Sequence, residues 1–156
     1  MGYEATSAVE QCVLLGVSGW EWPDWDDGFY PSDMPPEWRL AYYNTQFPCV
    51  FVPATQWRGV SAETMGHWGE DTHARFLFLL ECSEGEAVPE ALREKARCIA
   101  AHDTRITWFD RHTDIKALAE ALRQVACSVR YVLSRDGDLV QLERVRTLLG
   151  LLGFMA

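Results

Sequence analysis

The chain has 156 residues, 48% of them hydrophobic, which suits one folded domain over 1–156 in which residues 1–11 are expected to be flexible. Its formal net charge of −9 repels phosphate backbones and anionic lipids, so we expect neither a nucleic acid nor a membrane as a partner. No apolar run reaches ~18 residues, and no membrane-spanning helix is predicted. Five cysteines without a Cys-x-x-Cys pair indicate reduced, buried thiols and a cytoplasmic protein.

From the amino end, the first elements alternate between strand and helix. An apolar run over 12–17 predicts a buried strand, and the loop that follows it as far as Pro36 is rich in Trp, Pro and Asp. Pro36 in a first turn favours a helix to 47, and a second strand is predicted over 49–52. Loops this long are usually functional or disordered, and the aromatic residues argue against disorder.

The same alternation continues to the carboxyl end of the chain. It comprises a helix capped by Ser61 and ending near 70, a strand over 75–82, a helix over 89–101, a strand over 105–109, a helix capped by Asp114, a strand over 129–133 and a last helix capped by Asp138. The Asp136-Gly137 turn is also compatible with a hairpin, but the apolar spacing after it is helical. The alternation predicts an α/β fold with a mainly parallel sheet of about five strands.

One segment carries a family resemblance. It reads Gly16-Val17-Ser18-Gly19-Trp20, then Trp25, Phe29-Tyr30-Pro31, Pro35-Pro36, Arg39-Leu40-Ala41-Tyr42-Tyr43 and Phe47. In order and spacing it resembles the opening of the YecE-like family (domain of unknown function 72), with a weaker match that extends the resemblance over roughly 13–82. The resemblance implies a TIM-barrel-like fold with a pocket at the carboxyl ends of the strands. The activity of this family is not established.

Two departures from the family bear on function. A full eight-stranded barrel needs at least ~200 residues, so we expect a truncated TIM-barrel-like fold or an open sheet, and a homodimer that covers the exposed sheet edge. Phe51 and Pro53 stand where the second strand of the family typically ends with Glu and then Asn, and Glu81 stands where the third often has Lys. Loss of these polar groups argues against an inherited acid–base reaction.

Candidate ligand-binding residues lie at the expected mouth of the barrel: Ser18, Trp20, Trp25, Tyr30, Thr55 and Trp57. Their aromatic rings can stack on a sugar or a base, or can instead pack as a cap on the barrel. Glu81, at the end of an apolar strand, and Asp24, in the aromatic loop, are the candidate catalytic carboxylates.

The remaining motifs exclude several kinds of site. The four histidines lack metal-ligand spacing, Ser18 lacks the Gly-x-Ser-x-Gly frame of a nucleophile elbow, and no Gly-rich phosphate loop is present. We therefore expect no metal and no cofactor.

Two functions stay open. The favoured one is a non-catalytic, degenerate relative that binds a partner or a small ligand. The alternative is a diverged, hydrolase-like enzyme that acts on a small polar or sugar-like substrate at the mouth. The enzyme hypothesis needs Glu81 or the loop aspartates within hydrogen-bonding reach of one another across a pocket that also holds Trp20. It fails if these side chains point to bulk solvent or if Phe51 fills the mouth.

Overall fold

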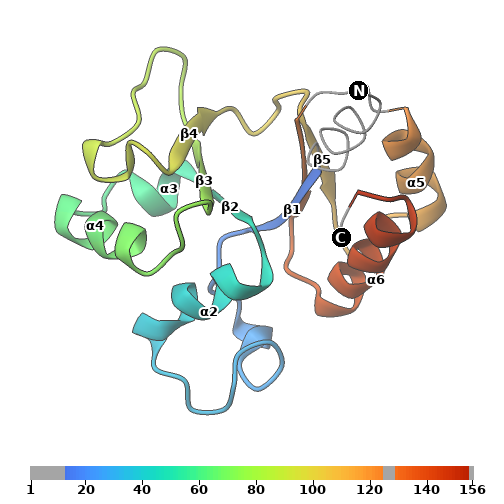
Figure 1. Cartoon of the computed structure of the whole chain (residues 1–156), viewed down its shortest axis with the longest axis horizontal. Helices are drawn as coiled ribbons and strands as arrows, with labels where there is room; N and C mark the ends of the chain where they lie inside the picture. Colours follow the sequence, from blue (N-terminus) through green and yellow to red (C-terminus); the bar gives the residue numbers. More distant parts are fainter. Residues whose placement is uncertain (1–12, 125–128, 155–156) are drawn as a thin grey trace, which may run out of the picture.

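Six short apolar segments form one curled parallel sheet (Figure 1). The computed structural model describes residues 13–124 and 129–154, so the expected flexibility of 1–11 lies outside it. The strands are β1 Val13–Ser18, β2 Cys49–Val52, β3 Leu77–Glu81, β4 Ala96–Ile99, β5 Ile106–Phe109 and β6 Arg130–Ser134. Their order across the sheet is β4-β3-β2-β1-β6-β5, and every pairing is parallel. The predicted TIM-barrel-like α/β fold is confirmed, in the form of a half-barrel.

Helices and short turns connect the strands. They are η1 Pro23–Trp25, η2 Pro36–Trp38, α2 Arg39–Gln46, α3 Ala54–Trp57, α4 Ala62–Glu70, η3 Glu90–Leu92, α5 Ile115–Arg123 and α6 Leu139–Leu151. The side chains of Ser61, Asp114 and Asp138 each accept a hydrogen bond from a backbone N–H in the first turn of α4, α5 and α6. These caps are the ones predicted from the sequence, and α6 follows the Asp136-Gly137 turn as a helix rather than as a hairpin strand.

Alternate strand residues point to the two faces of the sheet. On the outer face, Val17, Val52 and Leu80 belong to the larger core, which lies between the sheet and the helices. On the inner face, Phe51 and Leu133 belong to a second cluster of buried side chains. This second cluster occupies the space that would be the interior of a closed barrel, so the inner face is packed rather than hollow.

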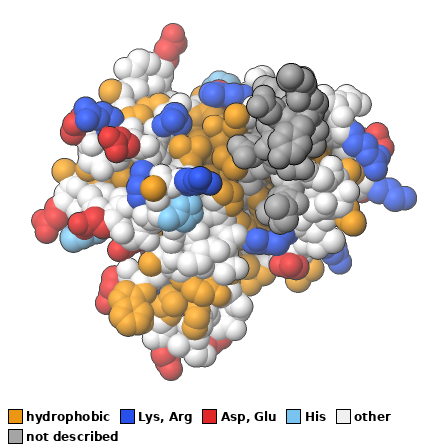
Figure 2. All heavy atoms as spheres, in the orientation of Figure 1, with side chains coloured by type: hydrophobic (Ala, Val, Ile, Leu, Met, Phe, Trp, Pro, Cys, Tyr) orange, Lys and Arg blue, Asp and Glu red, His pale blue; other side chains and the backbone are white. Residues whose placement is uncertain are grey.

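The sheet is open between its two edge strands, β4 and β5. Strand β6 pairs with β1 from Val13↔Arg130 to Val17↔Ser134, so the last strand returns to the first as it does in a closed barrel. Only residues 100–105 separate β4 from β5 in the chain. A crossover between neighbouring parallel strands takes a dozen or more residues. Residues 100–105 therefore connect two strands that are not neighbours and cross the open side of the half-barrel. Figure 2 shows hydrophobic side chains in the region between β4 and β5.

The helix expected over 89–101 is wrong. Only the short turn η3 follows Pro89, and the residues after it form β4. The local sequence favours a helix, but Phe78 N donates to Lys95 O at 2.7 Å and Leu80 pairs with Cys98 in register. Pairing with β3 therefore overrides the local propensity, and the sheet has six strands rather than about five.

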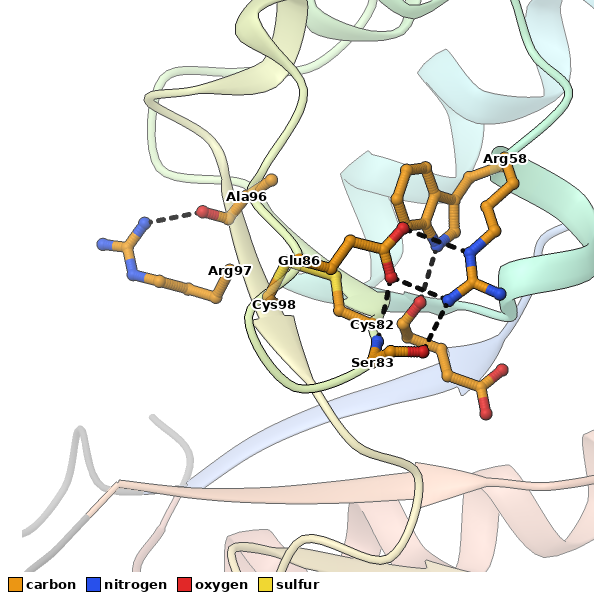
Figure 3. Close-up of a disulfide and its surroundings, with 9 residues drawn as sticks. Arg58, Cys82, Ser83, Glu86, Ala96, Arg97 and Cys98 are labelled. Carbon is orange, nitrogen blue, oxygen red and sulfur yellow. Dashed lines mark hydrogen bonds and ion pairs between the residues drawn. A yellow bond between two sulfur atoms is a disulfide. The ribbon is translucent and has the colours of Figure 1, made fainter.

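The expectation of reduced thiols is also wrong for one pair. Cys82, just after β3, and Cys98, in β4, form a disulfide with a Cα–Cα distance of 5.3 Å (Figure 3). Cys49 is the free cysteine in the described part of the chain, and it is buried. Because disulfides persist mainly in oxidising compartments, the cysteines no longer argue for the cytoplasm. Across 13–124 and 129–154, no helix is long and apolar enough to cross a membrane.

Candidate functional site

The aromatic loop after β1 is fastened to the core by two of its predicted ligand-binding residues. Trp25 and Tyr30 are buried, with exposed fractions of 0% and 3%. Trp25 Nε1 donates to Gly137 O at 2.7 Å, and the Tyr30 hydroxyl donates to Trp20 O. Burial also raises the pKa of Tyr30. The structure therefore gives both rings a packing role, and neither presents a face on which a ligand can stack.

Three further predicted residues lie along the carboxyl ends of β1 and β2. Ser18 is half-buried, and its carbonyl accepts a hydrogen bond from Trp22 Nε1 at 3.1 Å. Thr55 is exposed on α3. Trp57 is buried, and its Nε1 donates to Glu81 O at 2.9 Å, so it joins α3 to the end of β3.

The two candidate catalytic carboxylates lie in different cavities. Glu81 lines a cavity of about 580 Å³ formed by the loops after β3 and β4, whereas Asp24 lines one of about 500 Å³ formed by the loops after β1, β5 and β6. Glu81 Oε1 accepts a hydrogen bond from Ala54 N at 2.9 Å, which holds the first turn of α3 against β3. The pair that acid–base chemistry would need is therefore not assembled around one pocket.

Between these cavities, the centre of the half-barrel is filled by aromatic packing. The rings of Phe51 and Trp108 meet edge to face with their centroids 5.0 Å apart. Phe51 is 3% exposed, and Trp108 Nε1 donates to Ala101 O at 2.8 Å. The contact joins β2 to β5 across the inner face.

The cavity beside Glu81 is also lined by both cysteines of the disulfide and by Glu86, which forms an ion pair with Arg58 (Figure 3). Arg58 Nη2 lies 2.7 Å from Glu86 Oε1, and the same oxygen accepts from Ser83 N at 2.9 Å. The hydrogen bond from Arg58 lowers the pKa of the Glu86 carboxyl. These polar groups form their ion pair and hydrogen bond with one another, and together they hold the loop after β3 in place.

The polar cleft is the cavity of about 500 Å³ beyond β1, β5 and β6, and the sequence pointed to only one of its carboxylates, Asp24. Its carboxylates mainly organise loops. Asp110 accepts from His112 N at 2.9 Å, and Asp136 accepts from Arg111 N at 3.1 Å. The sequence feature that could have identified the other residues of this cleft is the run of charged residues directly after two predicted strands.

A third cavity, which we call the tryptophan groove, lies between the aromatic loop and α4. It has a volume of about 740 Å³, and its lining includes Trp20, Glu21, Glu37, Trp38, Trp68 and Asp71. Trp20 and Trp68 meet edge to face with their centroids 5.1 Å apart, and Trp68 stacks on Phe78 of β3 at 6.1 Å. Trp38, at the end of η2, is 60% exposed. Trp20 is the one predicted site residue that lines this groove.

Neighbouring elements hold the groove residues in place. Gly19 adopts a φ of 77° and donates its N–H to Phe51 O at 2.8 Å, which turns the chain outward after β1. Tyr30 then binds the carbonyl of Trp20 from the other end of the loop. Figure 2 shows hydrophobic side chains gathered over the segment that carries η2 and α2, with acidic side chains at its margin.

These features define an open relative of the (β/α)₈ barrel, with the three cavities described above around the carboxyl ends of the strands and the loops that follow them. The chain belongs to the family described as "Protein of unknown function DUF72", whose model matches residues 14–151. The match extends well past the 13–82 segment that carried the resemblance, and it includes β5 and β6.

One solved structure illustrates the likeness. A DUF72 family protein from Thermotoga maritima is similar to this chain at 17% sequence identity with a TM-score of 0.41, over 87% of this chain and 62% of that one. The chain thus spans 62% of the length of that neighbour. No curated protein matches the chain.

Proposed function

We propose that this protein is a non-catalytic binding domain and that it binds its ligand or partner in the tryptophan groove. The observation that carries the proposal is the exposed Trp38 ring, 60% accessible, at a groove walled by the Trp20–Trp68 pair. The other exposed large hydrophobic residues of the described chain, Val129, Val140 and Leu151, are aliphatic. Aromatic rings in a concave surface supply contact area at low entropic cost, which is typical of binding sites.

The positions of the polar residues favour binding over catalysis. Trp20, Glu81 and Asp24 line three separate cavities, although the enzyme hypothesis required them around one pocket. Phe51 fills the centre of the half-barrel together with Trp108. Both observations support the binding hypothesis, and the diverged enzyme stays the alternative.

A thermal-shift screen with two exposed substitutions tests the proposal. Trp38→Ala removes the exposed ring. Leu151→Ala, at a residue that is 81% exposed on α6 and lines a separate apolar cavity of about 940 Å³, is the control for binding at that other cavity. Surface substitutions of this kind change stability by about 0.5 kcal/mol or less, so both variants should fold. We expect compounds that raise the Tm of the wild type and of Leu151→Ala but not that of Trp38→Ala. Hits that are indifferent to Trp38→Ala, or turnover of any hit, would overturn the proposal.

The cytoplasmic location remains a proposal of its own, and the Cys82–Cys98 pair tests it. Cytoplasmic reductants would keep the pair as thiols, whereas an oxidising compartment would preserve the disulfide. Thiol labelling of the protein from acid-quenched cells should therefore find both cysteines free if the cytoplasm is correct. Blocked cysteines would place the protein in an oxidising compartment.

A further inference from the structure

We infer that the tryptophan groove recognises a positively charged, arginine-containing segment of a partner protein. This inference rests on the proposed function and adds the charge and the source of the ligand.

The polar lining of the groove is acidic. Glu21, Glu37 and Asp71 contribute carboxylates, and none of the described lining residues is Lys or Arg. His67 is the remaining ionisable group of the lining, and its Nδ1 lies 3.1 Å from Glu70 Oε1. A negative potential concentrated in a concave surface attracts cations and repels anions.

Two of these carboxylates are available to a ligand. Glu21 already has an ion-pair partner, because Arg39 Nη1 lies 3.6 Å from Glu21 Oε1. Within the described chain, neither the Glu37 nor the Asp71 side chain has an ion-pair partner within 4.0 Å. A bound guanidinium would supply the missing positive charge and can donate two parallel hydrogen bonds to a carboxylate.

The aromatic lining points to the same ligand. Trp is the best aromatic partner for a cation, and arginine stacks its planar guanidinium on the ring more readily than lysine does. Trp38 is the exposed ring of the groove, and it neighbours Glu37 in the chain. An exposed ring and a free carboxylate that line one cavity match the two binding modes of one arginine side chain.

The dimensions and the net charge favour a partner segment over a single small cation. A volume of about 740 Å³ lies in the range of sites that take a drug-sized ligand, which is larger than one side chain. The net charge of −9 also steers a basic partner toward this protein over longer distances. A nucleotide would stack on the same rings, but its phosphate would meet three carboxylates.

Fluorescence anisotropy with labelled five-residue peptides tests the inference. The probes are Gly-Arg-Gly-Arg-Gly and matched peptides in which Lys, Gln or Glu replaces both Arg. We expect the Arg peptide to bind the tightest and the Gln peptide to bind at least ~10-fold more weakly. Trp38→Ala should weaken binding of the Arg peptide by ~3- to 10-fold, and Glu37→Gln with Asp71→Asn should weaken it at least as much.

A charge-matched control separates the groove from general attraction. Glu84→Gln with Glu94→Gln removes the same two charges at exposed positions outside the groove. This control should change the affinity by less than ~2-fold at physiological salt, where surface charges are screened. A loss as large as that of the groove variant would overturn the inference.

Two further binding measurements show whether the positively charged ligand is a protein segment or a small molecule, and they distinguish this inference from the proposed function. Arginine amide that binds as tightly as the peptide would overturn the assignment to a protein segment. Neutral or anionic ligands that depend on Trp38 while the Arg peptide does not bind would overturn the inference and leave the proposed function standing. If no ligand of any charge depends on Trp38, both proposals fail.

Discussion

At the residue scale, Gly137 determines how the aromatic loop meets the rest of the molecule. It adopts a φ of 68°, and a Cβ at this position would lie 2.8 Å from the Trp22 ring. Its carbonyl accepts the hydrogen bond from Trp25 Nε1, and its N–H donates to Ser134 Oγ at 3.0 Å. The turn between β6 and α6 thus clamps the loop that follows β1.

Gly137→Ala should therefore destabilise the protein more than the same change at an open glycine. A left-handed backbone costs about 1–2 kcal/mol for alanine, and overpacking against the Trp22 ring adds about 1–3 kcal/mol. Gly85 has a φ of 83° with no neighbour within 4 Å, so Gly85→Ala carries only the backbone cost. Urea unfolding of both variants measures the difference. Equal losses would mean that the Trp22 ring moves aside without cost.

The sequence could predict which residues make the aromatic loop but not which way each ring faces. Trp20, Trp25 and Tyr30 were all expected at the mouth, yet only Trp20 lines a cavity. The spacing in a long loop has no fixed period, so it does not separate inward from outward residues as it does in a helix. Trp38 falls within the helix predicted from Pro36 to 47, but η2 ends at this residue and its ring is 60% exposed.

At the element scale, the edge strand β4 depends on a covalent tie. Cys82 and Cys98 are separated by 16 residues, and the bond closes a loop that contains η3. Closing a loop of about 15 residues stabilises a protein by ~3 kcal/mol in the chain-entropy model. Backbone hydrogen bonds also attach β4 to β3, including Cys82 N to Ile99 O at 3.1 Å.

Reduction should therefore lower the stability without removing the fold. A loss of ~3 kcal/mol corresponds to ~6–12 °C in Tm for a domain of this size. Thermal unfolding with and without a phosphine reductant measures the shift. The double variant Cys82→Ala and Cys98→Ala should melt at the lower temperature in both conditions. A reductant effect that persists in this variant would assign the loss to something other than the disulfide.

Elements with a strong local signal could be predicted, whereas β4 could not. The caps at Ser61, Asp114 and Asp138 act within one turn of each helix, so the sequence alone contains the cause. The formation of β4 depends on β3 and on Cys82, and both lie well before it in the chain. A segment whose partners are distant shows its local preference, which here is helical.

At the scale of the whole molecule, the open half-barrel has two edges that no strand of residues 13–124 and 129–154 pairs. Strands β4 and β5 end the sheet, and residues 100–105 join them across the opening. Because unpaired edges promote association, we propose a homodimer that covers them. Light scattering at several concentrations should give twice the monomer mass. A monomer at every concentration would indicate that the short edges are protected within the chain.

Both cores contain buried groups that ionise at high pH, and these should limit the stability of the whole molecule in alkali. Burial raises the pKa of the Cys49 thiol and of the Tyr43 and Tyr131 hydroxyls. Tyr43 also accepts from Val17 N at 2.9 Å and donates to Cys49 O at 2.7 Å, so its proton is part of the packing. In the unfolded chain, thiols ionise near pH ~8.5 and tyrosines near pH ~10.

Between the unfolded-state pKa and the raised folded-state pKa of each group, the unfolded chain has released protons that the folded chain still holds. Deprotonation therefore favours unfolding, and the free energy of unfolding should fall steadily as the pH rises above ~8.5. Urea unfolding at pH 7, 9, 10 and 11 measures this slope. In Cys49→Ala the decline should begin only near pH ~10, where the tyrosines take over. A free energy of unfolding that stays constant up to pH 11 would mean that these groups ionise without leaving the core.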